Sequence, residues 1–378
     1  MRRLRKCIDP GRFLYSSAAL AVLVLTQIAA AETIQTVAAG LDNPRGLNFG
    51  PDGALYVAEA GRGGAGPCAP GPEGTRCYGA TGAITRIDLR SGQKAGVASG
   101  LPSLAGEAGD FAIGPHDIAF VGLGNASITI GFSGDPRDRQ LQFGAAGASL
   151  ARLAGMQAGG NWRLGTDLGL YESANNPTGD EVDSNPYGML QLPGKLIVAD
   201  AGGNDLIQVN ANGSITTLAV FPDRLEDAPP FLELPPGTKI PMDAVPTNVS
   251  LGPDGYYYVG QLTGFPFPAG GANVYRVPPA GGTPQIHAGG FSAIIDTVFG
   301  PDGSLYVLEI ARNGLLDAFI NNNWTGALIR VAPNGTRSEL AAGQLIAPGG
   351  VAVGSDGSLY VTVNSVYPGT GAVLRIKQ

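Results

Sequence analysis

The chain has few of the residues that metal and cofactor sites most often need. Its 378 residues include 3 cysteines and 2 histidines, too few to build a zinc site from Cys and His. Basic residues are also scarce, with 24 Lys and Arg against 31 Asp and Glu and a formal net charge of −7. This charge repels phosphate backbones and anionic membrane surfaces, so we expect neither nucleic acid nor a lipid surface as a partner.

The sequence motifs of several common enzyme classes are missing too. The chain has no phosphate-binding P-loop, no H-E-x-x-H zinc motif, no G-x-S-x-G nucleophile turn and no D-x-D-x-D-G calcium loop. The segment GRGGAG at 61–66 matches the G-x-G-x-x-G pattern of dinucleotide-binding folds. Pro67 and Cys68 follow it, however, where that fold needs the start of a helix. We therefore do not expect a dinucleotide cofactor.

The one long apolar run lies at the N-terminus. Residues 1–31 begin with the basic segment MRRLRK, continue with FLYSSAALAVLVLTQIAA and end in three alanines. This order predicts a secretory signal peptide, and the alternative is an uncleaved anchor helix. No later run is long enough to span a bilayer. We expect an exported mature chain, periplasmic or extracellular, in which residues 32–378 form a single domain.

Two of the three cysteines belong to this mature chain. Cys68 and Cys77 lie close together in the Gly- and Pro-rich segment GPCAPGPEGTRCYG. An even pair of cysteines at short spacing in an exported protein predicts a local disulfide.

Glycine and proline are abundant, with 59 and 29 residues, and they recur at turns. A Pro-Asp-Gly or Ser-Asp-Gly turn stands between two apolar strands in four near-copies of one segment. Proline presets φ, aspartate bonds to the local backbone and glycine accepts a positive φ, so this triplet favours a tight turn. The four copies are FGPDGALYVAE (49–59), LGPDGYYYVGQ (251–261), FGPDGSLYVLE (299–309) and VGSDGSLYVTV (353–363).

Each copy opens a unit of four predicted strands, and two degenerate units at 115–134 and 185–221 fill the middle of the chain. The units begin near residues 46, 117, 188, 248, 296 and 350. Six units of four antiparallel strands predict an all-β fold, a six-bladed β-propeller. The sixth unit lacks its fourth strand, and TIQTVAAGL at 33–41 matches the missing pattern. We expect this segment to close the ring and remove an exposed sheet edge.

In such a propeller the connections alternate between two faces. The connections between first and second strands are short, and we call their side the short-turn face. The opposite, loop-rich face carries the long insertions, and loops on a rigid scaffold often carry function; the alternative is drift in loop length. These insertions are 60–81, 134–147, 222–246, 263–271 and 310–325.

The start of each inner strand is predicted to lie at the channel mouth on the loop-rich face. The six equivalent positions hold Gly46, Asp117, Gly188, Asn248, Asp296 and Gly350. Asp117, Asn248 and Asp296, with Asn185 close by, offer oxygen ligands of the kind that Ca²⁺ prefers. The alternative is a hydrated channel with internal hydrogen bonds.

His116, beside Asp117, is the candidate catalytic residue. A histidine titrates near neutral pH and can therefore act as a general base. The alternative is a channel histidine that is bonded to a neighbouring carboxylate.

Several phrases together resemble the ScyD/ScyE family, and the resemblance covers nearly the whole mature chain. They are NPRGLNFGPDGALYVAEAG, YESANNP, DSNPYG, VADAGGNDLIQV, PTNVSLGPDGYYYVGQLTGFPFP and FGPDGSLYVLEI. The resemblance implies an exported propeller and carries over no catalytic residue. More distantly, the architecture is similar to six-bladed calcium-dependent lactonases and esterases of the gluconolactonase and paraoxonase type. The four oxygen-bearing residues resemble their metal site in kind, although Glu59 ends a second strand and leaves the first blade without an equivalent ligand.

Two functions follow as hypotheses. The first is a binding or scaffold protein, expected to be a monomer, that engages a small molecule or a protein through the loop-rich face. The second is a calcium-assisted hydrolase or isomerase that uses the channel and His116. A quinone-dependent sugar dehydrogenase is disfavoured, because few basic residues are available to hold an anionic cofactor. The residues alone do not decide whether the chain is an enzyme.

Overall fold

The Pro-Asp-Gly turns connect the two innermost strands of a blade and also tie them to the third strand. In each repeat the turn glycine has a positive φ, 75° at Gly53 for example. The turn aspartate accepts a backbone hydrogen bond within the turn and pairs with an arginine of the third strand. Three of these pairs measure 2.7–2.8 Å, and the fourth joins Asp356 to Arg375. The repeated turn is therefore a small cross-strand clamp.

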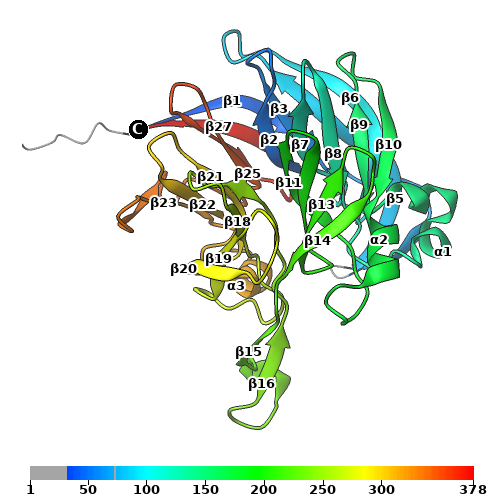
Figure 1. Ribbon diagram of the computed structural model, residues 1–378, viewed down its shortest axis with the longest axis vertical. Helices are drawn as coiled ribbons and strands as arrows, with labels where there is room; N and C mark the ends of the chain where they lie inside the picture. The colour runs from blue at the N-terminus through cyan, green and yellow to red at the C-terminus, as the bar shows by residue number, and fades with distance from the viewer. Residues whose placement is uncertain (1–31, 72–73) are drawn as a thin grey trace, which may run out of the picture. The chain divides into compact units, whose positions relative to one another are not determined.

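The computed structural model describes residues 32–71 and 74–378, and the predicted signal peptide lies outside this part. The described residues contain six blades of four antiparallel strands each, arranged in a ring (Figure 1), which confirms the six-bladed β-propeller; the sheet of the first blade has β4 (Cys68–Gly71) as an additional strand. The first three blades consist of β2 (Pro44–Phe49), β3 (Leu55–Glu59), β5 (Gly74–Ile87) and β6 (Lys94–Ala105); β7 (Pro115–Val121), β8 (Asn125–Ile130), β9 (Arg152–Met156) and β10 (Trp162–Asp167); and β11 (Pro186–Leu192), β12 (Lys195–Asp200), β13 (Asp205–Asn210) and β14 (Ile215–Val220).

The second half of the ring repeats the pattern. Its blades consist of β17 (Ser250–Leu251), β18 (Tyr257–Gly260), β19 (Ala272–Val277) and β20 (Gln285–Phe291); β21 (Ile294–Phe299), β22 (Leu305–Glu309), β23 (Ala327–Val331) and β24 (Arg337–Leu340); and β25 (Gly350–Val353), β26 (Leu359–Val363), β27 (Gly371–Lys377) and β1 (Thr33–Leu41).

The last blade closes as predicted. Strand β1 lies beside β27 (Figure 1), antiparallel, with Thr33 opposite Lys377 and Leu41 opposite Gly371. The two ends of the described chain thus complete one sheet, and β27 has no exposed edge.

Aromatic pairs join neighbouring blades. The tyrosine of the repeated second strand packs edge-on against a phenylalanine near the end of the next inner strand. Ring centroids are 4.7 Å apart for Tyr56 and Phe120, 4.8 Å for Tyr258 and Phe299, and 5.4 Å for Tyr360 and Phe49. The tyrosine recurs in the repeats because it makes the same contact between blades at several places around the ring.

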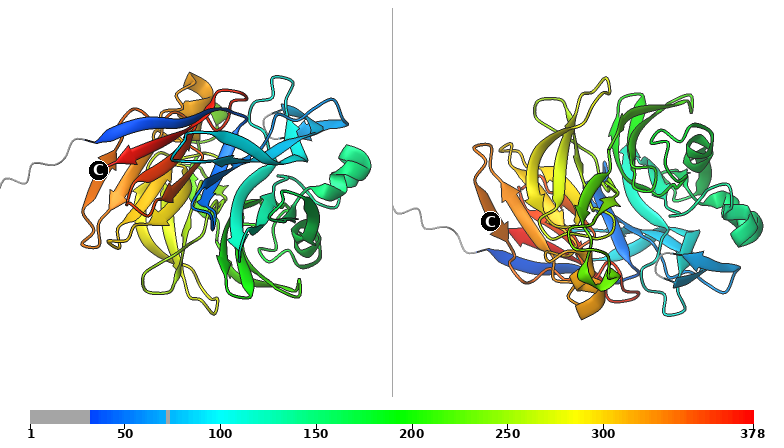
Figure 2. Two further views of the ribbon diagram at one scale, coloured as in Figure 1. Left: turned by 90° about the horizontal axis from the view of Figure 1, so that it is seen from above. Right: turned by 90° about the horizontal axis from the view of Figure 1, so that it is seen from below.

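The insertions of the loop-rich side hold the remaining elements. The hairpin of β15 (Arg224–Asp227) and β16 (Lys239–Met242), with η2 (Pro230–Leu232) between them, projects from the ring (Figure 1). Helix α1 (Arg139–Phe143) stands at the outer edge of the second blade (Figure 2), followed by η1 (Gly144–Ser149). The others are α2 (Leu168–Asn175) and α3 (Leu315–Asn321). No helix in the described ranges has both the length and the apolar character to cross a membrane.

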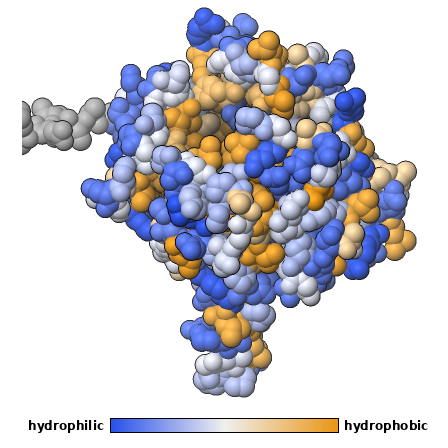
Figure 3. Space-filling model, viewed as in Figure 1, coloured by the Kyte–Doolittle hydropathy of each residue, from blue (hydrophilic) through white to orange (hydrophobic). Residues whose placement is uncertain are grey.

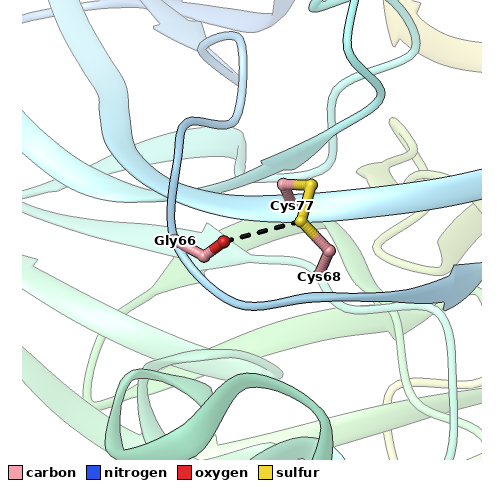
Figure 4. The surroundings of a disulfide bond; sticks show 3 residues. All are labelled: Gly66, Cys68 and Cys77. Atoms are coloured by element: carbon pink, nitrogen blue, oxygen red, sulfur yellow. Dashed lines mark hydrogen bonds between the residues drawn. A yellow bond between two sulfur atoms is a disulfide. The ribbon is translucent and has the colours of Figure 1, made fainter.

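The predicted disulfide is confirmed. Cys68 in β4 (Cys68–Gly71) faces Cys77 in β5, and their sulfurs are bonded (Figure 4). The Gly66 carbonyl oxygen lies 3.5 Å from the Cys68 sulfur. The bond fastens the first insertion onto a blade strand.

Strand β1 gives a direct test of ring closure. Leu41 is buried between the first and last blades, next to Leu47 and Val373. We expect Leu41→Ala to lower the free energy of unfolding by about 2–5 kcal/mol, because it leaves a cavity at the seam. Thr33→Ala, an exposed change on the same strand, is the control and should stay within about 0.5 kcal/mol of the parent. Urea unfolding followed by circular dichroism measures both, and equal stability of the two variants would contradict closure by β1.

Candidate functional site

Neighbouring inner strands lie close together at three of the six equivalent positions identified in the repeats. A Cβ on Gly46 would lie 2.4 Å from Asp117 Oδ1, and one on Gly188 would lie 2.6 Å from the Asn248 Cα. A Cβ on Gly350 would lie 2.8 Å from the Arg45 carbonyl oxygen. Glycine is therefore required at three of the six positions because a neighbouring blade occupies the space.

The two aspartates of this layer join adjacent blades. Asp117 accepts from the backbone N–H of Ile118 at 2.8 Å and from that of Met189, in the next blade, at 2.9 Å. Asp296 repeats this arrangement three blades further on, with Thr297 at 2.8 Å and Val351 at 2.7 Å. Each carboxylate thus receives one hydrogen bond from its own strand and one from the neighbouring inner strand.

Asn248 also joins two adjacent blades, the fourth and the fifth, but as a donor to the neighbouring blade. Its Oδ1 accepts from the Gly260 N–H at 2.8 Å, and its Nδ2 donates to Thr297 Oγ1 at 2.6 Å. Asn185 lies elsewhere: its Oδ1 accepts from the Phe132 N–H at 3.1 Å. The structure thus brings together three of the four predicted calcium ligands.

These hydrogen bonds decide how well the three residues fit a metal ion. Ca²⁺ needs six to eight oxygen ligands, and the side-chain oxygens of Asp117, Asn248 and Asp296 already accept backbone hydrogen bonds. Across residues 32–71 and 74–378, no group of three or more His, Cys, Asp or Glu side chains could hold a metal ion. The arrangement does not fit a channel metal centre and favours the alternative, a channel with internal hydrogen bonds. The calcium ligand set stays a prediction.

His116 is enclosed in the wall between the second and third blades. It is 1% exposed, its ring lies 4.3 Å from that of Tyr187, and its Nδ1 is 3.1 Å from the Pro186 carbonyl oxygen. A carbonyl only accepts, so Nδ1 carries the proton. Burial, assisted by the charge of Arg45, lowers the pKa of His116 to about 3. The histidine is therefore neutral at physiological pH, and its partner is a carbonyl instead of the expected carboxylate.

The channel contains a cavity of about 380 Å³. It extends from the layer of Asp117, Asn248 and Asp296 to the ends of the inner strands. Most of its lining residues are hydrophobic, but the surface exposed in the cavity is more polar than apolar, and its floor is formed by Asp117, Asn248 and Asp296. Asn48 and Leu251 line the cavity and are exposed, so it opens on the short-turn face. In the view of Figure 3, apolar side chains gather around the middle of the ring. A concave site with a few convergent polar groups is typical of small-molecule binding.

The opposite end of the channel is filled. Side chains from several connections and Tyr187 from the start of β11 pack into one hydrophobic cluster; they are Phe111, Tyr187, Leu262, Phe267, Trp324 and Tyr367. Phe111 and Trp324 have ring centroids 5.4 Å apart. The three polar residues therefore lie inside the channel, below this cluster, and not at a mouth on the loop-rich face as predicted.

The cavity floor is electrostatically unusual. Burial raises the pKa of Asp117 to about 7. Burial and the nearby charge of Asp117 raise the pKa of Asp296 to about 8. Hydrogen bonds from the neighbouring blades oppose these shifts without cancelling them. At neutral pH the floor therefore holds carboxyl groups that are partly protonated.

Sequence reasoning missed the cavity walls. The apolar lining comes from the last residues of the inner strands, including Phe49, Leu251, Phe299 and Val353. Each of these residues stands two positions before the Pro-Asp or Ser-Asp of a repeated turn. That fixed position next to the turn is the signal that could have identified them.

Comparisons with known proteins show the fold. No family model matches the chain, and no curated protein matches its sequence. A glucose dehydrogenase structure is 14% identical with a TM-score of 0.52, over 92% of this chain and 99% of that chain. The PQQ-bound aldose sugar dehydrogenase of Streptomyces coelicolor gives 14% and 0.51 over the same shares. A streptogramin B lyase gives 14% and 0.49, over 92% and 98%. The class of protein is thus a six-bladed β-propeller.

The channel carboxyls predict a pH dependence of stability. Both pKa values are raised above the ordinary 3.8, so the native state binds more protons than the unfolded state between these values. The contribution of the two groups is complete below about pH 4 and is lost as the pH rises through about 7–8. We expect the free energy of unfolding, measured with urea, to fall between about pH 5 and pH 8.5.

Asp296→Asn should make this fall smaller, because one titrating group is removed. Asp302→Asn is the matched control: a hydrogen bond from Arg330 holds the pKa of Asp302 at about 2, below the range tested. An Asp296→Asn variant with the full pH dependence of the parent would contradict the raised pKa.

Proposed function

We propose that the protein is an exported binding protein of the ScyD/ScyE type. Its ligand is a small molecule, neutral or cationic, with both apolar and polar groups, that occupies the channel cavity from the short-turn face. The carrying observation is the hydrogen bonding of Asp117, Asn248 and Asp296. These side chains bond to the neighbouring blades and leave a preformed cavity above a polar floor.

The charge of the cavity supports this class of ligand. Its lining contains two carboxyl groups and no lysine, arginine or histidine. An anionic ligand would face these carboxyls without a compensating cation and would lose its own hydration. A neutral or cationic group can instead accept from a protonated carboxyl or pair with an ionised one. The same argument disfavours an anionic quinone cofactor, despite the likeness in fold to sugar dehydrogenases.

Export is supported by the disulfide, since such bonds persist in oxidising compartments. The signal peptide and the ScyD/ScyE membership belong to the same proposal and depend on the sequence. Engagement of a protein through the loop-rich face is less supported, because on that side the channel is filled by the hydrophobic cluster around Phe111 and Trp324.

The alternative, a calcium-dependent lactonase-like hydrolase, needs free oxygen ligands in the channel and a base that reaches the cavity. The three candidate ligands are engaged with the neighbouring blades, and His116 is not among the residues that line the cavity. A binding role requires neither condition and is therefore preferred.

The binding site can be tested with a matched pair of fluorescent probes. We expect N-phenyl-1-naphthylamine, which is uncharged, to gain fluorescence saturably with residues 32–378. The anionic 1-anilinonaphthalene-8-sulfonate should gain much less. Ser250 lines the cavity, where its hydroxyl lies 3.1 Å from Thr297 Oγ1. Ser250→Phe should fill the cavity and remove most of the signal of the neutral probe.

Ser250→Ala is the control, because it removes the same hydroxyl without filling the space, and it should retain binding. If Ser250→Phe binds the neutral probe as well as the parent does, the ligand site lies outside the channel and the proposal fails.

A further inference from the structure

A second group of acidic side chains lies away from the channel, where helix α2 meets the third blade. Glu172 from α2, Asp183 from the following loop, and Asp200 and Asp205 from the ends of β12 and β13 surround the turn at residues 201–204. A Cβ on Gly203 would lie 3.2 Å from Glu172 Oε2 and 3.5 Å from Asp200 Cγ. The helix carboxylate and the strand carboxylate therefore flank the same glycine.

The register of the sheet brings like charges together. Asp200 and Asp205 are directly opposite each other in the β12–β13 pair. Like charges at such a position are destabilising unless something neutralises them. Asp200 ends β12, Asp205 begins β13, and Glu172 of α2 lies near them. The negative charges of these carboxylates thus need a compensating group.

Two of the four carboxylates are well provided with hydrogen bonds. Asp200 accepts from the backbone N–H groups of Asn185, Gly202 and Gly203 and from the Ser184 hydroxyl. Asp183 accepts from the Gly134 N–H at 2.6 Å and lies within the electrostatic influence of Arg76. These two groups therefore have partners that hold them in place.

Glu172 and Asp205 differ in this respect. They are 3% and 1% exposed, and Glu172 Oε1 and Asp205 Oδ2 have no hydrogen-bond partner. In the part of the chain that is described, neither residue forms an ion pair with a lysine or an arginine. A buried carboxylate oxygen without a partner is costly, and native proteins rarely leave one in this state.

The carboxyl groups of Glu172 and Asp205 both have raised pKa values. Burial, with the charges of Asp200 and Asp183, raises the pKa of Glu172 to about 7. Burial, with the charges of Asp200 and Glu172, raises the pKa of Asp205 well above its usual range. Glu172 Oε1 and Asp205 Oδ2 are thus buried oxygens without a partner in a group of four carboxylates, and this is the feature that points to a cation site.

We propose that Glu172 and Asp205 bind a divalent cation, with Ca²⁺ as the expected ion, and that Asp200 adds to the negative field as a positioning residue. The donors are oxygens only, which suits a hard cation. Two acidic ligands leave the remaining positions to water and backbone carbonyls. The cation would fasten helix α2 to the third blade.

Calorimetric titration of CaCl₂ into chelator-treated and desalted protein, residues 32–378, tests the site. We expect saturable binding to the parent. Glu172→Gln and Asp205→Asn should each weaken Ca²⁺ binding by at least about tenfold, because even residues that only hydrogen-bond to metal ligands have effects of this size. Asp117→Asn, which alters the channel floor, should bind Ca²⁺ as the parent does.

Thermal melting in chelator shows whether the variants fold. Glu172→Gln keeps the shape of the side chain and removes a repelling charge, so it should melt at or above the temperature of the parent. Added Ca²⁺ should raise the melting temperature of the parent and not that of Glu172→Gln. Absence of binding to the parent, or unchanged binding to folded Glu172→Gln, would overturn the proposal. Loss of binding in Asp117→Asn alone would also overturn it and would place the ion in the channel.

Discussion

The form of the channel depends on one type of contact, in which a channel side chain accepts the backbone N–H of the next inner strand. Asp117 accepts a hydrogen bond from the Met189 N–H, and Asp296 accepts one from the Val351 N–H three blades further on. Inner strands converge on the axis, so their edges cannot form a continuous sheet from blade to blade, and the exposed N–H groups need acceptors. Glycine at the neighbouring positions lets the strands approach closely enough for these bonds.

This contact also determines the character of the channel. Because the carboxylates bond to the backbone of the blades, the cavity above them is bordered by the ends of the inner strands. Because they are enclosed, their pKa values rise to about 7 and 8. The aromatic cluster on the loop-rich side fills the other end. A structural requirement of the blades therefore leaves one cavity on the short-turn face, with a floor that disfavours anions.

The fold could be predicted from the sequence because the same turn recurs with a strand on either side. The copies at 49–59, 251–261, 299–309 and 353–363 establish the period, and the missing last strand identifies 33–41 as the closing segment. The disulfide followed from two nearby cysteines. The repeats, the closing strand and the disulfide could all be predicted because each depends on a short pattern in the sequence.

The candidate site could be predicted only in part, because its meaning depends on distant partners. A channel aspartate looks the same in sequence whether its partner is a metal ion or a backbone N–H that lies 72 positions away, as for Asp117. The pair Glu172 and Asp205 was missed because a helix in an insertion and a strand end have no common spacing. Asp183, by contrast, belongs to an acidic segment that is visible in the sequence.

The most direct test of the channel account is a crystal structure of residues 32–378 grown in millimolar calcium. The account predicts that Asp117 and Asp296 keep their hydrogen bonds to Met189 and Val351, with no ion between them. A calcium ion bound by Asp117, Asn248 and Asp296, with those hydrogen bonds broken, would contradict it and would restore the metal-dependent hydrolase as the leading function.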